Sequence, residues 1–544
     1  MRIHCGRQNM RFIKFKEHLM TKPKEYRDTI QTGVTGLDEI FLGGVKANNI
    51  ILVEGSSGSG KTTLGLEFIY RGAKDLKENG LIISFELSPQ KLMRDAQGFG
   101  WDLAQLQKKN KIKIIYTNPS VILQELQNPD GVLVNEIRNL DAKRIFIDGL
   151  TPLKIFGELV NGRPFRDSLH LLVETLQRFG VTAMITREMP EGAAAGSGAM
   201  DHEQFVCDTI ITLSNTTNQR NTHRYIEIKK SRGQDFISGQ HTMRIEAGRG
   251  VCVYRRTQSR PKQYNDQLTS SVKGSSGIPS LDQIMGGGLY EGSTTLAVGI
   301  SGSGKTVLGV QFLLEGAKRG QKGLHITLDE HPKQILRNAG SLGLQLEEHV
   351  KKGNIIIQYE SPLELEMDVH FEKIVNVIEE NNIKRVVVDS LAAYESTNPK
   401  EAQQFIYALT TYFKNKLITA FCNYESPELL GLSQISVDLK ASAIVDNIVL
   451  LSYVEISTKL RRAILVPKVR GAQIPQITRE FFIESGGIKI VEDNRVQAKE
   501  FEEVPQLPLS SYYGILSRAP ARQSPLLEGK IVRGEEMPSS PKIR

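Results

Sequence analysis

Cysteine and long apolar runs are both scarce in this chain of 544 residues. Its four cysteines, Cys5, Cys207, Cys252 and Cys422, lie far apart and form no C-x-x-C pair, so neither a zinc site nor a disulfide framework is indicated. No apolar run approaches the roughly 18 residues that a membrane-spanning helix needs. The N-terminal segment also lacks the apolar core of a signal peptide. We therefore expect a soluble, cytoplasmic protein without a membrane partner.

Positive charge is in modest excess and is unevenly distributed. The formal net charge is +8, and residues 1–28 hold five of these charges, with eight Lys or Arg against three Asp or Glu. A nucleic-acid-binding domain normally carries its charge on a folded face and not in a tail. Nucleic acid is therefore the weaker hypothesis for a partner.

A phosphate-binding P-loop is the strongest motif in the sequence. The segment Gly55-Ser56-Ser57-Gly58-Ser59-Gly60-Lys61-Thr62 fits G-x-x-x-x-G-K-[ST] and follows a strand-like apolar run. Glycines let backbone N–H groups turn toward a phosphate, the lysine can reach the β- and γ-phosphates, and the threonine hydroxyl can bind Mg²⁺. These eight residues and the following Thr63 are thus predicted to bind ATP and Mg²⁺.

The same motif occurs a second time, 244 residues later. It reads Gly299-Ile300-Ser301-Gly302-Ser303-Gly304-Lys305-Thr306 and is followed by Val307. A Gly-x-x-x-Leu-Asp motif precedes both loops at the same offset, which indicates a tandem duplication of one α/β nucleotide-binding domain. The expected organisation is a basic tail (1–28), a first domain (29–258), a linker (259–276), a second domain (277–496) and a flexible, Pro- and Ser-rich C-terminal tail (497–544).

Acidic residues at the ends of apolar runs are candidates for the chemistry. Glu86 follows one such run, and ligands bind beside the carboxyl ends of strands in open parallel α/β sheets. There a carboxylate can act as the general base that activates water for attack on the γ-phosphate; a plain surface acid is the alternative. In the second repeat Asp329 aligns with Glu86, and Glu330 follows it. Asp148 and Asp389 end buried-looking runs in the Walker B pattern that supports the metal.

A Lys-x-Arg-Gly motif recurs near the end of each repeat. It provides Lys230 and Arg232 in the first repeat and Lys468 and Arg470 in the second. Alternate side chains of a strand share a face, so such a pair can reach a neighbouring subunit's γ-phosphate as an arginine finger acting in trans. A solvated strand end is the alternative, and the recurrence favours the finger.

These motifs, together with Phe99-Gly100-Trp101-Asp102-Leu103 and Val388-Asp389-Ser390-Leu391, make the chain resemble the KaiC family of double-domain RecA-type ATPases and autokinases. The resemblance implies tandem RecA-like P-loop domains, each with a mostly parallel, twisted sheet flanked by helices. It further implies a two-tiered homohexamer with ATP at subunit interfaces, a slow ATPase in the first tier and a serine/threonine autokinase in the second. A protein partner on the C-terminal tail is a further possibility.

The sequence departs from the family pattern at the catalytic acids and the phosphoacceptors. Leu87 replaces the second glutamate of the family's Glu-Glu pair in the first repeat, and the pair reads Asp329-Glu330 in the second. The family's adjacent Ser-Thr acceptors align with Ser442 and Ala443, so Ser442 alone could accept a phosphoryl group; a structural serine is the alternative. Two other readings stay open: a RecA-class motor that depends on nucleic acid, and a scaffold clamped by nucleotide without kinase activity.

Overall fold

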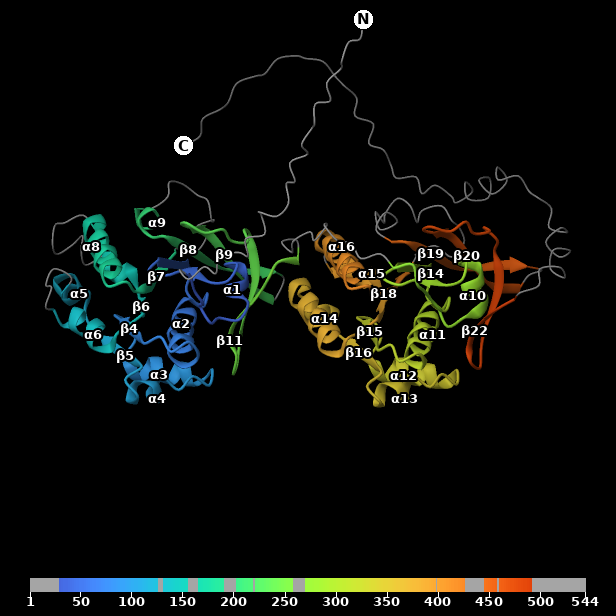
Figure 1. Cartoon of the computed structure of the whole chain (residues 1–544), viewed down its shortest axis with the longest axis horizontal. Helices are drawn as coiled ribbons and strands as arrows, with labels where there is room; N and C mark the ends of the chain where they lie inside the picture. Colours follow the sequence, from blue (N-terminus) through green and yellow to red (C-terminus); the bar gives the residue numbers. More distant parts are fainter. Residues whose placement is uncertain are drawn as a thin grey trace, which may run out of the picture.

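A computed structural model describes residues 29–125, 131–154, 165–189, 202–218, 221–257, 270–397, 399–425, 445–456 and 459–491. It contains two α/β domains that lie side by side, each built on one large sheet (Figure 1). No helix in these ranges combines the length and apolarity that crossing a membrane requires.

The nine described strands of the first sheet lie in the order β11-β10-β9-β8-β3-β7-β6-β4-β5. From β5 to β8 all neighbours are parallel, and β9, β10 and β11 extend the sheet by antiparallel pairing. The strands are β3 (Ile50–Gly55), β4 (Gly80–Ser84), β5 (Ile112–Tyr116), β6 (Arg144–Asp148), β7 (Thr182–Glu188), β8 (Thr209–Asn218), β9 (Asn221–Ser231), β10 (Gln240–Glu246) and β11 (Gly250–Tyr254).

Helices cover both faces of this sheet, because alternate residues of its buried strands face opposite sides. Ile51 and Val53 of β3 belong to the apolar core that includes α2, α3 and α4. Ile50 and Leu52 belong to the core that includes α6 and α8. The helices are α1 (Leu37–Ile40), α2 (Lys61–Asp75), α3 (Pro89–Gln97), α4 (Leu103–Lys108), α5 (Pro119–Glu125), α6 (Val132–Leu140), α8 (Phe165–Arg178) and α9 (His202–Val206).

The second domain repeats this arrangement strand for strand, in the order β22-β21-β20-β19-β14-β18-β17-β15-β16. Its strands are β14 (Thr294–Gly299), β15 (Gly323–Thr327), β16 (Ile355–Tyr359), β17 (Arg385–Asp389), β18 (Thr419–Glu425), β19 (Asn447–Ile456), β20 (Lys459–Val469), β21 (Arg479–Glu484) and β22 (Gly487–Ile490). Its helices are α10 (Pro279–Ile284), α11 (Lys305–Lys318), α12 (Pro332–Ser341), α13 (Leu346–Lys351), η2 (Pro362–Glu364), α14 (Met367–Asn381), α15 (Leu391–Thr397) and α16 (Pro399–Asn415). The structure thus confirms the predicted tandem of mostly parallel, helix-flanked sheets.

A buried arginine ties the lead-in of each domain to its P-loop helix. Short antiparallel pairs form the lead-ins, β1 (Thr29–Ile30) with β2 (Val45–Lys46) and β12 (Lys273–Gly274) with β13 (Leu289–Tyr290). Arg144 is fully buried, donates to the carbonyls of Thr32 and Phe68 and forms an ion pair with Glu78. In the second domain Arg385 donates to the carbonyls of Ser275, in the lead-in, and Phe312, in the P-loop helix, but its side-chain partner is the neutral Gln321. The repeated arginine therefore fixes the lead-in in both domains.

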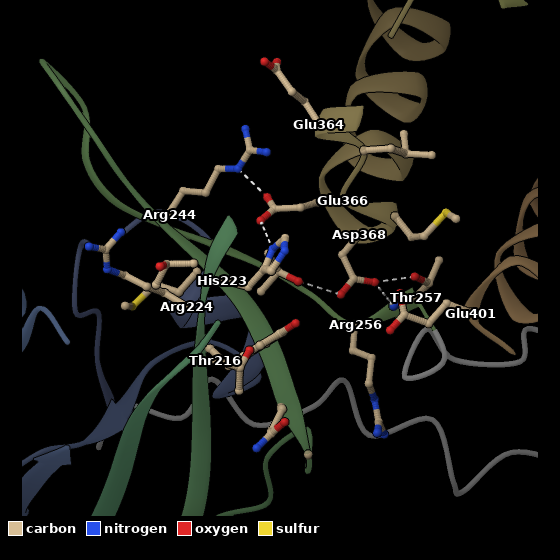
Figure 2. A pocket seen from close by; sticks show the side chains of 18 of the residues that line it. Thr216, His223, Arg224, Arg244, Arg256, Thr257, Glu364, Glu366, Asp368 and Glu401 are labelled. Carbon is tan, nitrogen blue, oxygen red and sulfur yellow. Dashed lines mark hydrogen bonds and ion pairs between the residues drawn. The ribbon is translucent and has the colours of Figure 1, made fainter. Parts of the chain in front are cut away.

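The two domains meet at a polar cleft of about 1320 Å³ between β9 and β10 on one side and the start of α14 on the other (Figure 2). Glu366 lies between two side chains of the first domain, 2.9 Å from His223 Nδ1 and in contact with Arg244 Nε. Asp368 accepts from the backbone N–H of Thr257 at 2.8 Å and from its hydroxyl. Two acids of the second domain therefore bind residues of β9, of β10 and of the segment after β11 in the first.

Candidate nucleotide-binding sites

The first P-loop connects the end of β3 to the start of α2. Gly58 and Gly60 adopt φ values of 71° and 103°, which glycine accepts without strain. Lys61 Nζ donates to the carbonyls of Gly55 and Ser56, at 2.9 and 2.7 Å, so the lysine lies back across its own loop. Burial lowers the pKa of Lys61, against the opposing effect of nearby carboxylates. The residues of the first P-loop therefore form a turn around the side chain of Lys61.

The Walker B acid lies directly beside this loop. The Thr62 hydroxyl is 3.2 Å from both carboxylate oxygens of Asp148, and Thr186 donates to the same carboxylate at 2.8 Å. Burial raises the pKa of Asp148, the hydrogen bonds from Thr186 and Thr62 lower it, and the negative charge of Glu86 raises it further. Glu86 is exposed just beyond β4 and within electrostatic reach of Asp148. The predicted lysine, threonine and two acids thus come together at one edge of the sheet.

The second P-loop repeats these contacts. Lys305 Nζ donates to the carbonyls of Gly299 and Ile300, both at 2.8 Å, and the Thr306 hydroxyl donates to Asp389 at 2.7 Å. A cavity of about 330 Å³ opens over this loop. It is lined by Lys305 and Thr306 and by four acids, Asp329, Glu330, Asp389 and Glu425.

The two acids after β15 differ in their surroundings. Ser390 donates to Asp329 at 3.1 Å, whereas Glu330 Oε2 is buried and has no hydrogen-bond partner among the described residues. Burial raises the pKa of both carboxyls; the charge of Asp389 acts in the same direction, and the hydrogen bond from Ser390 opposes the shift at Asp329. The backbone N–H groups of Glu330 and Leu87 bond to equivalent hydroxyls, those of Thr327 and Ser84. Asp329 therefore occupies the place of Glu86.

One acid at each site was not predicted from the sequence. Glu188 pairs in register with Gly55, the first residue of the P-loop, and Glu425 pairs in the same way with Gly299. Both end the strand adjacent to the P-loop strand, so both lie at the edge where phosphate is expected. Each carboxylate counteracts the lowering of the P-loop lysine's pKa that burial causes. The sequence signal that could have identified Glu188 and Glu425 is an acid at the end of an apolar strand, the same signal that identified Asp148.

The Lys-x-Arg pairs lie far from the P-loop of their own domain. Ser231 pairs with Thr209, which pairs with Ile51 near the start of β3, whereas the P-loop begins at Gly55. Four residues of strand separate these two positions along the sheet, about 13 Å. Lys230 binds the carbonyls of three residues around the end of α9, and Lys468 binds the corresponding Val445 carbonyl. In each domain the pair therefore lies at the side of the sheet where the parallel strands begin, whereas the P-loop lies at the side where they end.

Four of the predicted features lie outside the described residues. They are the acceptor Ser442, the basic tail, most of the linker and the C-terminal tail. Three of the four cysteines lie among the described residues: Cys207, Cys252 and Cys422 are buried free thiols.

Two RecA-like sheets, each with a P-loop and a Walker B acid at one edge, define a tandem P-loop ATPase. Comparison with known proteins identifies the particular family. A family model described as "ATPase: KaiC" matches residues 30–258 and again residues 274–495, so the chain belongs to the KaiC family.

Curated relatives match over most of their length. The circadian clock oscillator protein KaiC of Picosynechococcus sp. is 34% identical over 475 residues, 86% of this chain and 90% of the relative. Its namesake from Thermosynechococcus vestitus is 31% identical over 504 residues, 91% of this chain and 92% of the relative. The circadian clock protein KaiC3 of Synechocystis sp. is 30% identical over 85% of this chain and 92% of the relative.

Proposed function

We propose that the chain forms a ring, most simply a homohexamer, in which each ATP lies between the P-loop of one subunit and the Lys-x-Arg pair of the next. The observation that carries this proposal is the position of that pair. In both domains it lies at the sheet edge opposite the P-loop of the same chain. A head-to-tail interface brings unlike edges of adjacent subunits together, and such an interface closes into a ring when its rotation permits.

At the first site the proposed reaction is hydrolysis of ATP. Lys61 and the loop N–H groups bind the phosphates, and exposed Glu86 takes a proton from the attacking water. Thr62 and Asp148 supply hydroxyl and carboxylate oxygens, the ligand type that Mg²⁺ prefers, already adjacent at 3.2 Å. When bound, Mg²⁺ would offset charge on the phosphates.

At the second site the proposed reaction is slow autophosphorylation of Ser442. Support comes from the family membership, from the alignment of Ser442 with a family acceptor and from the acids near Lys305 and Thr306. Asp329 is one methylene shorter than glutamate and is held by Ser390, so proton abstraction should be slow. Ala443 has no hydroxyl, which limits the pair to a single phosphate. The cellular role proposed is that of a signalling or timing ATPase in the cytoplasm.

The trans arrangement has a direct test by subunit mixing. One protein carries Lys61→Ala, the other carries Lys230→Ala with Arg232→Ala, and both carry Lys305→Ala to silence the second site. Each alone should release little phosphate. In an equal mixture about a quarter of the interfaces combine an intact loop with an intact pair, so activity should reappear. No recovery in mixed rings of the correct mass would refute the arrangement.

A further inference from the structure

A charged row crosses the centre of the first sheet beside the P-loop. Glu54, the residue before Gly55, is only 3% exposed and pairs in register with Arg187 on β7 and Thr212 on β8. Arg187 donates to its carboxylate at 2.6 Å and Thr212 at 3.0 Å. The row is therefore a hydrogen-bonded polar strip inside the sheet.

This strip is attached to α9, and α9 in turn holds the Lys-x-Arg pair. The side-chain amide of Gln204 donates to both oxygens of Glu54, at 3.0 and 3.2 Å. The backbone carbonyl of the same Gln204 accepts from Lys230 Nζ at 2.8 Å. Arg232 donates to the next carbonyl, that of Phe205, at 2.6 Å. Continuous contacts thus run from the P-loop strand to the pair at the opposite edge.

The second domain lacks this row although its sheet is the same. Val298 stands at the place of Glu54, and its register partners are Tyr424 and Leu450. A row of apolar and aromatic residues therefore suffices for the fold. A buried ion pair seldom adds stability over such a row, because removing two charges from water is costly. The first domain's row thus points to a role other than folding.

We propose that Glu54 and Gln204 are positioning residues that couple the first-domain ATP sites of adjacent subunits. This inference rests on the proposed ring, in which Lys230 and Arg232 act on the neighbour's nucleotide. Lys61 donates to the carbonyls of Gly55 and Ser56, so a phosphate that takes Lys61 as its partner would compete for these hydrogen bonds beside Glu54. Gln204 passes that shift to α9, whose carbonyls hold Lys230. ATP binding at one first-domain site thereby changes the ATP affinity of the site on the adjacent subunit.

The test is the ATP dependence of phosphate release by the full chain carrying Lys305→Ala. We expect a Hill coefficient above 1 for this parent and a coefficient closer to 1 for Gln204→Leu, which keeps the side-chain bulk but removes the amide and leaves the Arg187–Glu203 ion pair to α9 intact. Thr212→Val is the matched control, because it removes one hydrogen bond to Glu54 without touching α9. Its coefficient should equal the parent's. Gln204→Asn, whose amide is one methylene shorter, serves as a second variant if Gln204→Leu does not fold.

Several outcomes would overturn the coupling. One is a Hill coefficient of 1 in the parent, and another is a Hill coefficient that stays at the parent's value in folded Gln204 variants. A third is a fall of the Hill coefficient in Thr212→Val as large as that in Gln204→Leu. A merely structural role for Gln204 would lower activity or stability and leave the coefficient unchanged. The mixing experiment with the Lys61 and Lys230/Arg232 variants is independent of Gln204. Recovery there with no effect at Gln204 would reject the coupling and keep the trans arrangement, whereas absence of recovery in rings of the correct mass would reject the trans arrangement on which the coupling rests.

Discussion

Glu67 provides a sharp test of how the P-loop helix is held, because the second domain contains its neutral counterpart. Glu67 lies inside α2, its side chain is 0% exposed, and it accepts from the N–H of Val251 at 2.7 Å and from Arg71 at 3.3 Å. At the same position of α11, Gln311 accepts from the N–H of Ile488 at 2.8 Å and donates to the carbonyl of Gly486 at 3.4 Å. We predict that Glu67→Gln stabilises the first domain at alkaline pH.

The size of the effect follows from the pKa of Glu67, which burial raises from its ordinary 4.5 to about 7 although Val251 and Arg71 act in the opposite direction. A carboxyl whose pKa rises on folding favours the folded state in its protonated form. Its contribution is full below about pH 4.5 and is lost as the pH rises through about 7. Between about pH 5 and about pH 8.5 the loss is about 2 to 3 kcal/mol of unfolding free energy. Glutamine does not ionise and avoids this loss.

The chain's single tryptophan gives an assay confined to the first domain. Trp101 is buried there, and a Cβ on Gly250 would lie 2.4 Å from its ring, which places it at the same hairpin that Glu67 holds. The unfolding midpoint followed by tryptophan fluorescence should be similar for the wild type and Glu67→Gln near pH 5. Near pH 8.5 the variant's midpoint should be higher by roughly 5–10 °C. Gln311→Glu is the control and should leave this signal unshifted. A difference independent of pH, or one of opposite sign, would refute the reasoning.

Four further predictions concern the sites and the domain contact. Glu86→Gln should reduce steady-state phosphate release about 100-fold, whereas Asp329→Asn should matter less; equal losses would show two equivalent hydrolases. Removing ATP should lower the mass seen by light scattering, since a nucleotide shared between subunits stabilises their assembly, and an unchanged mass would contradict this. Incubation with MgATP should place a single phosphate on Ser442, slowly, as phosphopeptide mapping would detect, and Lys305→Ala is the control that should stay unphosphorylated. Phosphate on Ser433 or Ser436 instead would contradict this prediction. Glu366→Ala should speed amide exchange at the start of α14 and leave α2 and α11 unchanged, and uniform exchange would reject the domain contact.

The sequence predicted the parts of each site that stand in a recognisable motif. The P-loops lie 244 residues apart, and the structure places Asp329 at the position of Glu86 because Ser84 and Thr327 close the same turn. Glu188 and Glu425 were missed because neither stands in a recognisable motif, and sheet register alone brings them beside the P-loops. Glu54 was missed as well. It stands within an apolar run, and its partners Arg187 and Thr212 are brought to it by sheet register, which local pattern does not reveal.

The second site contains an acid that the first site lacks. Glu86 and Asp329, which occupy equivalent places, are both exposed to solvent. Glu330 has no acid counterpart in the first domain, where Leu87 takes its place, and its Oε2 is buried without a partner among the described residues. An acceptor atom withheld from solvent can take a proton from a hydroxyl that the protein itself presents, while bulk water competes poorly for it. Within the proposed function, Glu330 is therefore a second candidate base, beside Asp329, for phosphoryl transfer to the Ser442 hydroxyl.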